Sequence, residues 1–273
     1  MTGELFGRER AVVAPGAVLV PDWLDPAAQR ELVVACREWA RPPAGLRTVR
    51  LPGGGQMSVR QVCLGLHWGV VTRCPTCGVA RKASAGCPQH WFPYAYTRTV
   101  QDGDGAPVKP FPALLGALAR RAVAEAYGEA YGTAYGTAFV QAAADGDEGV
   151  PAGPVSGVEG YAPDVALVNH YGEGAHMGLH QDREERVDAP VVSLSLGDSC
   201  VFRLGNSETR TRPWTDLELR SGDLLVFGGP ARYAYHGVLR TLPGSADPGL
   251  DLGAPGPALT GRLNITVRQS GLA

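Results

Sequence analysis

The stretch at residues 262–268, Arg-Leu-Asn-Ile-Thr-Val-Arg, alternates strictly between polar and apolar side chains. Side chains of a β-strand point alternately to the two faces of its sheet. The stretch therefore predicts a strand with Leu263, Ile265 and Val267 on one face. Its other face carries two arginines, an amide and a hydroxyl. Such a row is common on an edge strand that faces solvent, but it would also suit a small dicarboxylate, because arginine binds carboxylates through a bidentate fork.

Other short apolar segments with turn residues between them predict more strands, a pattern typical of a β-sandwich or barrel. We expect strands at residues 17–20, 61–66, 164–171, 191–196, 200–204, 215–220 and 223–228. Apolar residues at helical spacing predict helices at residues 26–40 and 111–127. Asp25 and Pro26 suit the N-cap and the first position of the first of these helices.

One imidazole and one carboxylate stand two residues apart in His180-Gln-Asp182, so an extended segment would point both to the same side. With His236 as the second histidine, they would form a two-histidine, one-carboxylate triad. That triad leaves open positions on iron(II) for a co-substrate and oxygen. A lone His-x-Asp also occurs as a loop histidine capped by an aspartate. Asn169 and Tyr171, again two residues apart, add hydrogen-bonding groups just upstream.

Along the chain the four motifs follow one another as Asn169-x-Tyr171, His180-x-Asp182, His236 and Arg262-x-Asn264-x-Thr266-x-Arg268. In that order and at roughly these spacings, they resemble the AlkB family of iron(II)- and 2-oxoglutarate-dependent dioxygenases. The resemblance covers residues 160–270 closely and extends loosely back to residue 10. It implies a mainly β (α+β) fold, a double-stranded β-helix or jelly roll with N-terminal helices and a nucleotide-recognition lid. The expected division is residues 1–160 for the helices and lid and residues 161–273 for the core, together one compact unit.

The resemblance also implies roles for individual residues. Iron(II) would be held by His180, Asp182 and His236. The 2-oxoglutarate pocket would be formed by Asn169, Tyr171, Arg262, Asn264, Thr266 and Arg268. The substrate would be contacted by Trp68, Trp91, Tyr94, Tyr96, Glu184 and Arg210. Glu184 departs from the aspartate usual in the family, which bears on the choice of base.

The implied activity is oxidative demethylation of N-alkylated bases, of the 1-methyladenine and 3-methylcytosine type. The substrate would be single-stranded DNA or RNA, and oxygen would be consumed with release of formaldehyde and succinate. Two other interpretations stay open. The same site would serve a hydroxylase of a small molecule or a protein side chain. A nucleic-acid-binding zinc protein on an inactive jelly roll is the non-enzymatic alternative.

An insertion within the expected lid carries Cys74-x-x-Cys77 and Cys87-x-x-His90. Two such turns supply four ligands for a tetrahedral structural zinc. The alternative is a pair of unrelated turns with free thiols. A His-Trp pair occurs at residues 67–68 and again at 90–91, so either tryptophan is a candidate for stacking on the substrate base.

Charge is distributed unevenly along the chain. Residues 41–100 contain seven arginines and one lysine and no aspartate or glutamate, although the net charge of the whole chain is −2. An acid-free basic segment with interleaved aromatic residues suits a single-stranded nucleic acid, because cations pair with phosphates and rings stack on bases. The alternative is an ordinary solvated surface.

Six cysteines without a secretory signal indicate thiols or metal ligands in a reducing compartment, so we expect a cytoplasmic protein. No run of about eighteen apolar residues occurs, and we therefore expect no membrane partner. We expect a monomer. The Gly- and Pro-rich residues 142–160 predict a flexible loop.

Overall fold

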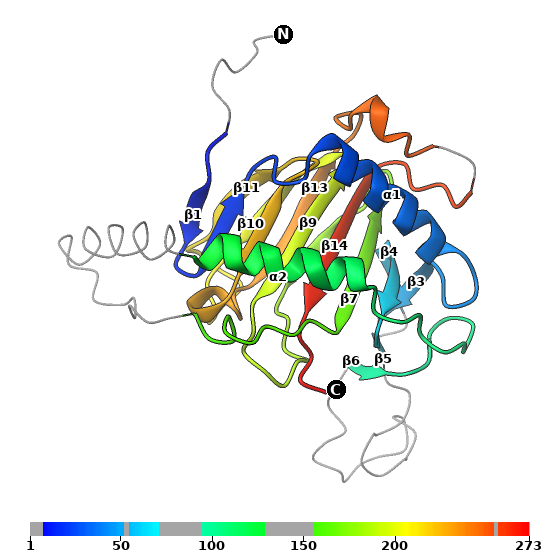
Figure 1. Cartoon of the computed structure of the whole chain (residues 1–273), viewed down its shortest axis with the longest axis horizontal. Coiled ribbons are helices and arrows are strands. Elements are labelled where there is room, and N and C mark those ends of the chain that lie inside the picture. Colours follow the sequence, from blue (N-terminus) through cyan, green and yellow to red (C-terminus); the bar gives the residue numbers. More distant parts are fainter. Residues whose placement is uncertain (1–7, 52–54, 71–93, 129–154, 254–255, 273) are drawn as a thin grey trace, which may run out of the picture.

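The computed structural model describes residues 8–51, 55–70, 94–128, 155–253 and 256–272. Two antiparallel sheets pack against each other, and two helices cover the outer face of the larger one (Figure 1). This is the expected mainly β architecture with a double-stranded β-helix core. None of the helices in the described ranges is long and apolar enough to cross a membrane.

The major sheet has eight strands, and every neighbouring pair is antiparallel. In order across the sheet they are β1 (Ala11–Ala14), β2 (Ala17–Val20), β12 (Leu224–Phe227), β9 (Val191–Gly197), β14 (Arg262–Arg268), β7 (Val165–Tyr171), β4 (Gln56–Leu64) and β3 (Arg47–Arg50). Strands from the first 64 residues therefore flank the C-terminal strands on both sides, and the sheet joins the two regions divided at residue 160.

The minor sheet has four strands, in the order β11 (Thr215–Leu219), β10 (Ser199–Leu204), β13 (His236–Leu242) and β8 (Met177–His180). A separate two-stranded hairpin contains β5 (His67–Val70) and β6 (Tyr94–Thr97). Short 3-10 turns cover Gly229–Ala231 and Pro248–Leu250.

Both helices follow the sequence prediction. Helix α1 (Pro26–Ala40) begins with Asp25 as N-cap, whose carboxylate accepts a hydrogen bond from the Ala28 amide at 2.8 Å. Helix α2 (Ala113–Tyr127) crosses the face of the major sheet (Figure 1). Their buried leucines pack with the apolar face of the sheet in one core, and each such side chain contributes roughly 2 kcal/mol when fully buried.

Strand β14 lies in the middle of the major sheet between β9 and β7, and all seven of its residues are buried. Its apolar residues belong to the core beneath the helices. Its polar residues line a cavity between the sheets. The edge-strand alternative is therefore wrong, because both edges of β14 are hydrogen-bonded and its buried polar face lines the cavity.

Six strands were not predicted from the sequence. They are β1, β3, β5, β6, β8 and β13. β8 reads Met-Gly-Leu-His and β5 reads His-Trp-Gly-Val, without the alternation of apolar residues that marks a strand. These segments are extended because a neighbouring strand pairs with them. Residues 142–154 of the expected flexible loop lie outside the described part of the chain.

Candidate active site

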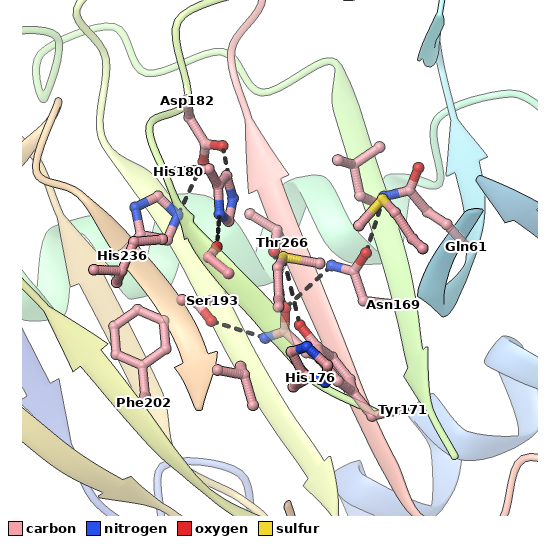
Figure 2. Close-up of a pocket in the computed structure, with 18 of the residues that line it drawn as sticks. Gln61, Asn169, Tyr171, His176, His180, Asp182, Ser193, Phe202, His236 and Thr266 are labelled. Atoms are coloured by element: carbon pink, nitrogen blue, oxygen red, sulfur yellow. Dashed lines mark hydrogen bonds and ion pairs between the residues drawn. The ribbon is translucent and has the colours of Figure 1, made fainter. Parts of the chain in front are cut away.

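The two predicted histidines and the aspartate come together at one end of the sandwich. β8 ends at His180, β13 begins at His236, and the antiparallel register places these two residues opposite each other. Asp182 follows β8 directly. One ligand atom from each residue lies within 4.8 Å of the other two, and the two imidazole rings are 4.5 Å apart (Figure 2). The group has the size and the ligand types of a mononuclear metal site.

Backbone carbonyls orient both imidazoles. The Nδ1 atom of His180 lies 3.0 Å from the Gly178 carbonyl oxygen, and that of His236 lies 2.9 Å from the Ala234 carbonyl oxygen. Donation from Nδ1 leaves the Nε2 lone pair for a metal. The Nε2 atoms lie 3.6 Å (His180) and 3.7 Å (His236) from the Asp182 carboxylate. Burial, with His180 nearby, lowers the pKa of His236 to about 4, so the ring is neutral at pH 7.

Asp182 is kept ionised by its neighbours. Burial alone would raise the pKa of its carboxyl, but the guanidinium of Arg268 and the two imidazoles hold that pKa well below its usual range. The Nη2 atom of Arg268 lies 2.7 Å from the Asp182 carboxylate. A metal ligand must be deprotonated to bind, and the neighbouring groups keep the Asp182 carboxylate in that state.

A cavity of about 470 Å³ extends from the triad between the two sheets. The six residues expected around 2-oxoglutarate all line it, namely Asn169, Tyr171, Arg262, Asn264, Thr266 and Arg268. Arg262 donates to the Ser195 hydroxyl at 3.0 Å and to the Asp198 carbonyl oxygen at 3.3 Å. Among the described residues, the buried Nε atoms of Arg262 and Arg268 have no hydrogen-bond partner. A dicarboxylate fits these donors.

An amide network that sequence reasoning missed runs across neighbouring strands along one wall of this cavity. Gln61 on β4 donates to the Asn169 amide oxygen at 2.9 Å, and Asn169 donates to Asn264 at 3.3 Å (Figure 2). Thr266 and Ser193 complete it at 2.9 and 2.8 Å. Gln61 follows Arg60 directly and precedes a short apolar stretch, and this local pattern does not reveal its partner.

The residues expected to contact the substrate do not all lie at the cavity. Trp68 and Glu184 line the cavity. Arg210 does not line it, and its guanidinium lies over the Tyr235 ring at 5.5 Å. Tyr96 does not line it either, and its hydroxyl donates to the buried Glu185 at 2.5 Å. We expected Tyr96 to face the substrate base; the hydroxyl instead turns toward this carboxylate.

Three further predictions fall outside what the structure describes. They concern Trp91, the side chain of Tyr94, and the four expected zinc ligands Cys74, Cys77, Cys87 and His90. The cysteines within the described ranges, Cys36, Cys63 and Cys200, are buried free thiols.

In the described part of residues 41–100, one of the arginines is withdrawn from the surface. Arg47 is buried and pairs with Asp102 at 2.5 Å, and the same carboxylate lies 3.0 Å from Nε2 of His67. The carboxylate comes from outside residues 41–100, so clustering in sequence gave no sign of it. Arg47 is therefore not available to a phosphate.

Comparison with known proteins agrees with this geometry. Residues 16–268 match the 2OG-Fe(II) oxygenase superfamily. An Arabidopsis thaliana protein named DNA N(6)-methyladenine demethylase ALKBH1D is 29% identical over 263 residues, which cover 94% of this chain and 50% of that protein. An AlkB homologue of Caulobacter vibrioides is 50% identical over 109 residues, 40% of this chain and 46% of that protein. The solved structure of OsALKBH1 superposes with a TM-score of 0.67 at 28% identity, covering 96% of this chain and all of the other.

The chain belongs to the 2OG-Fe(II) oxygenase superfamily and, within it, to the AlkB family. The expectation of iron(II) and 2-oxoglutarate as cofactors is thereby confirmed. The chain spans about half the length of the Arabidopsis and Caulobacter relatives that it matches.

Proposed function

We propose that the chain is an iron(II)- and 2-oxoglutarate-dependent oxidative demethylase of N-alkylated bases in nucleic acid. One observation carries the proposal: the His180, Asp182 and His236 group opens into a cavity that is also lined by Arg262, whose buried Nε atom has no hydrogen-bond partner among the described residues. The expected substrates are 1-methyladenine and 3-methylcytosine in single-stranded DNA or RNA. The Arabidopsis relative is named for N6-methyladenine in DNA, which adds that base as a candidate.

The roles of the residues follow from their positions. His180, Asp182 and His236 would hold iron(II), which with 2-oxoglutarate and oxygen supplies the oxidising chemistry. Arg262 would bind one carboxylate of 2-oxoglutarate at the far end of the cavity. Arg268, already beside Asp182, would hold the end nearer the metal. The amides of Asn169 and Asn264 and the Tyr171 ring would shape the space between.

The substrate base would enter beside Trp68 and Glu184. Trp68 offers a ring for stacking, and Glu184 offers a carboxyl whose pKa is raised by burial. A base inside a duplex cannot reach such a cavity unless it is flipped out, at a cost of a few kcal/mol. Single strands should therefore be the better substrates.

The alternative is hydroxylation of a small molecule or a protein side chain by the same site. The burial of Arg47 favours it, because this burial removes one cation from the basic segment expected to bind phosphates. The cavity and the metal group serve either reaction, so the choice depends on the substrate assay.

The assay is mass spectrometry of methylated oligonucleotides after incubation with iron(II), 2-oxoglutarate and oxygen. Single- and double-stranded forms carrying 1-methyladenine, 3-methylcytosine or N6-methyladenine should be compared, with His180→Ala as the control. We expect loss of one methyl group, faster on single strands, with equimolar succinate and formaldehyde. Succinate without demethylation of any oligonucleotide would leave the oxygenase but favour the alternative substrate class.

A structural zinc bound by Cys74, Cys77, Cys87 and His90 is a second proposal, supported by their spacing alone. Its binding energy would contribute to local folding of the lid. Elemental analysis of protein purified without chelators should give about one zinc per chain, lost in Cys77→Ser. Zinc-free protein would contradict the proposal. We also propose a monomeric, cytoplasmic protein, to be tested by light scattering and by fractionation of cells.

A further inference from the structure

Tyr96 lies where the β5–β6 hairpin contacts the core of the molecule. It belongs to β6 of the small hairpin, and its hydroxyl donates to Oε1 of Glu185 at 2.5 Å. Arg268, on β14, reaches the same hydroxyl at 3.4 Å and the same Glu185 oxygen at 3.2 Å. Glu185 and Arg268 are both buried, so this is a group of interior contacts between the hairpin and the core.

The same group also holds Asp182. Arg268 pairs with the Asp182 carboxylate at 2.7 Å. On the other side of Glu185, the fully buried Arg232 donates to Oε2 of Glu185 and to the Asp182 carbonyl oxygen, both at 2.9 Å. The carboxylate and the backbone of Asp182 are thus held by two arginines that share one glutamate. Any shift of Glu185 changes what both arginines can offer to Asp182.

The hairpin depends on side chains for its attachment. Within the described ranges, β5 and β6 pair with each other and with no strand of the larger sheets. Trp68 on β5 stands opposite Tyr96 on β6, so the two side chains share a face of the hairpin. Trp68 lines the cavity, whereas Tyr96 reaches the buried glutamate. The backbone of Trp68 has a separate attachment, a 2.7 Å hydrogen bond from Arg47 to its carbonyl oxygen.

We infer that Tyr96 is a positioning residue that couples the β5–β6 hairpin to Asp182 through Glu185 and Arg268. The inference rests on the proposed function in that a metal binds at Asp182. When a metal and 2-oxoglutarate draw on Asp182 and Arg268, the contacts of Glu185 and hence of Tyr96 must readjust. Coupling between two sites is reciprocal. The hairpin that presents Trp68 to the substrate would therefore be ordered by loading of the metal site, and the hairpin in turn would favour loading.

The test compares hydrogen–deuterium exchange of the unmodified chain and Tyr96→Phe, each with and without Mn(II) and 2-oxoglutarate under anaerobic conditions. In the unmodified chain, loading should slow exchange at Tyr94–Thr97 by about 5-fold or more, together with exchange at Met177–His180. In Tyr96→Phe, the effect at Tyr94–Thr97 should disappear while that at Met177–His180 persists. The Mn(II) dissociation constant should rise by about 5-fold, because the hairpin no longer helps to hold Glu185, Arg268 and Asp182 in the arrangement that binds the metal.

Tyr127→Phe is the matched control. It removes a tyrosine hydroxyl that donates to the Gly16 carbonyl oxygen at 2.8 Å, on α2 and away from the cavity. It should respond to loading as the unmodified chain does. Glu185→Gln keeps the shape of the side chain, removes its charge, and should reproduce the loss of coupling. Circular dichroism of each variant should match that of the unmodified chain and so check that it is folded.

The outcomes separate the coupling from the metal site. An unchanged response at Tyr94–Thr97 in Tyr96→Phe, with Met177–His180 protected by Mn(II), overturns the coupling alone. Absence of protection at Met177–His180 in the unmodified chain overturns the proposed metal site and the coupling with it. Loss of the hairpin response in Tyr96→Phe and Glu185→Gln but not in Tyr127→Phe supports the inference.

Discussion

The residues of the metal group differ in what else they do for the fold. The His236 ring packs against Phe202 and Phe227, with ring centroids 5.9 and 5.0 Å away, and is buried. The His180 side chain is 34% exposed. One histidine is therefore part of the core between the sheets, and the other lies at its open end.

Replacement of either histidine should abolish metal binding, but the effects on stability should differ. We expect His180→Ala to change the free energy of unfolding by about 0.5 kcal/mol or less, because the side chain is partly exposed. His236→Ala should cost about 1–3 kcal/mol, because it leaves a cavity between two phenylalanines. Urea unfolding of the metal-free variants measures the difference, and Mn(II) titration measures binding. Tight Mn(II) binding by either variant would remove that histidine from the site.

Arg262 is a buried cation that forms no ion pair within the described residues. An unpaired buried charge is costly and a nearby anion relieves the cost. The cavity is thus prepared for an anion at the expense of the stability of the unliganded protein.

Arg262→Met should separate these two effects. Removal of an unpaired buried charge in favour of an apolar side chain should leave the unliganded protein as stable as before, or more stable by about 1–3 kcal/mol. The same change should weaken 2-oxoglutarate binding by about 2–5 kcal/mol, because the ligand carboxylate loses its partner. Thermal unfolding and calorimetric titration give the two numbers. Unchanged affinity would mean that 2-oxoglutarate binds elsewhere in the cavity.

Among the elements, strand β14 contributes both to the hydrophobic core and to the cavity. Its apolar face anchors both helices and its polar face forms one wall of the cavity. The edge strand β3 connects other segments through Arg47, which pairs with Asp102 and donates a hydrogen bond to the Trp68 carbonyl oxygen. This arrangement joins the loop after β6 and the hairpin to the edge of the major sheet.

The Asp102 contact predicts a pH dependence of stability. Burial would raise the pKa of Asp102, but hydrogen bonding to His67 and the charge of Arg47 lower it from 3.8 to about 2. The folded protein then binds fewer protons than the unfolded chain between these values, so this contribution is complete above pH 4 and is lost as the pH falls toward 2. Asp102→Asn should cost about 3 kcal/mol at pH 6.

Urea unfolding of the unmodified protein and Asp102→Asn across this pH range measures the contribution. Their difference should shrink by about 2 kcal/mol as the pH approaches 2. Asp216→Asn is a suitable control, because Asp216 forms an exposed pair with Arg203 on the outside of the minor sheet. If the difference in the free energy of unfolding stays constant with pH, the pKa of Asp102 is the same in the folded and unfolded states.

At the scale of the whole molecule, the two regions divided at residue 160 share one sheet. β2 pairs with β12 along one side of the C-terminal strands, and β4 pairs with β7 along the other. The helices that cover this sheet also come from the N-terminal region. The C-terminal region contains the metal group but not the partners that protect its strands.

Residues 161–273 expressed alone should therefore not fold cooperatively. Isolation exposes two sheet edges and the apolar face that α1 and α2 bury, which favours aggregation. Circular dichroism melting and a two-dimensional amide NMR spectrum of the fragment, beside the full chain, provide the measurement. A sharp unfolding transition with dispersed amide signals would show that this region is an independent domain.

Local sequence patterns were sufficient for the features that depend on near neighbours. The alternation at residues 262–268 indicated a strand and assigned its two faces correctly, and Asp25 with Pro26 marked the start of α1. The His-x-Asp motif lies next to a strand end, where two side chains in the same direction meet a third ligand. Periodicity and capping involve residues close together in the chain, so they can be predicted from the sequence alone.

What each polar face contacts was decided only by the tertiary structure. Periodicity could not tell whether the polar row of β14 meets solvent or a cavity, because both give the same alternation. Gln61 and Asn169 are 108 positions apart, and Tyr96 and Glu185 are 89 apart. Such contacts depend on strand register and on the burial of polar groups against one another, which the pattern of either segment alone does not encode. The candidate metal ligands could therefore be predicted from the sequence, whereas the contacts that hold them in place are known only from the tertiary structure.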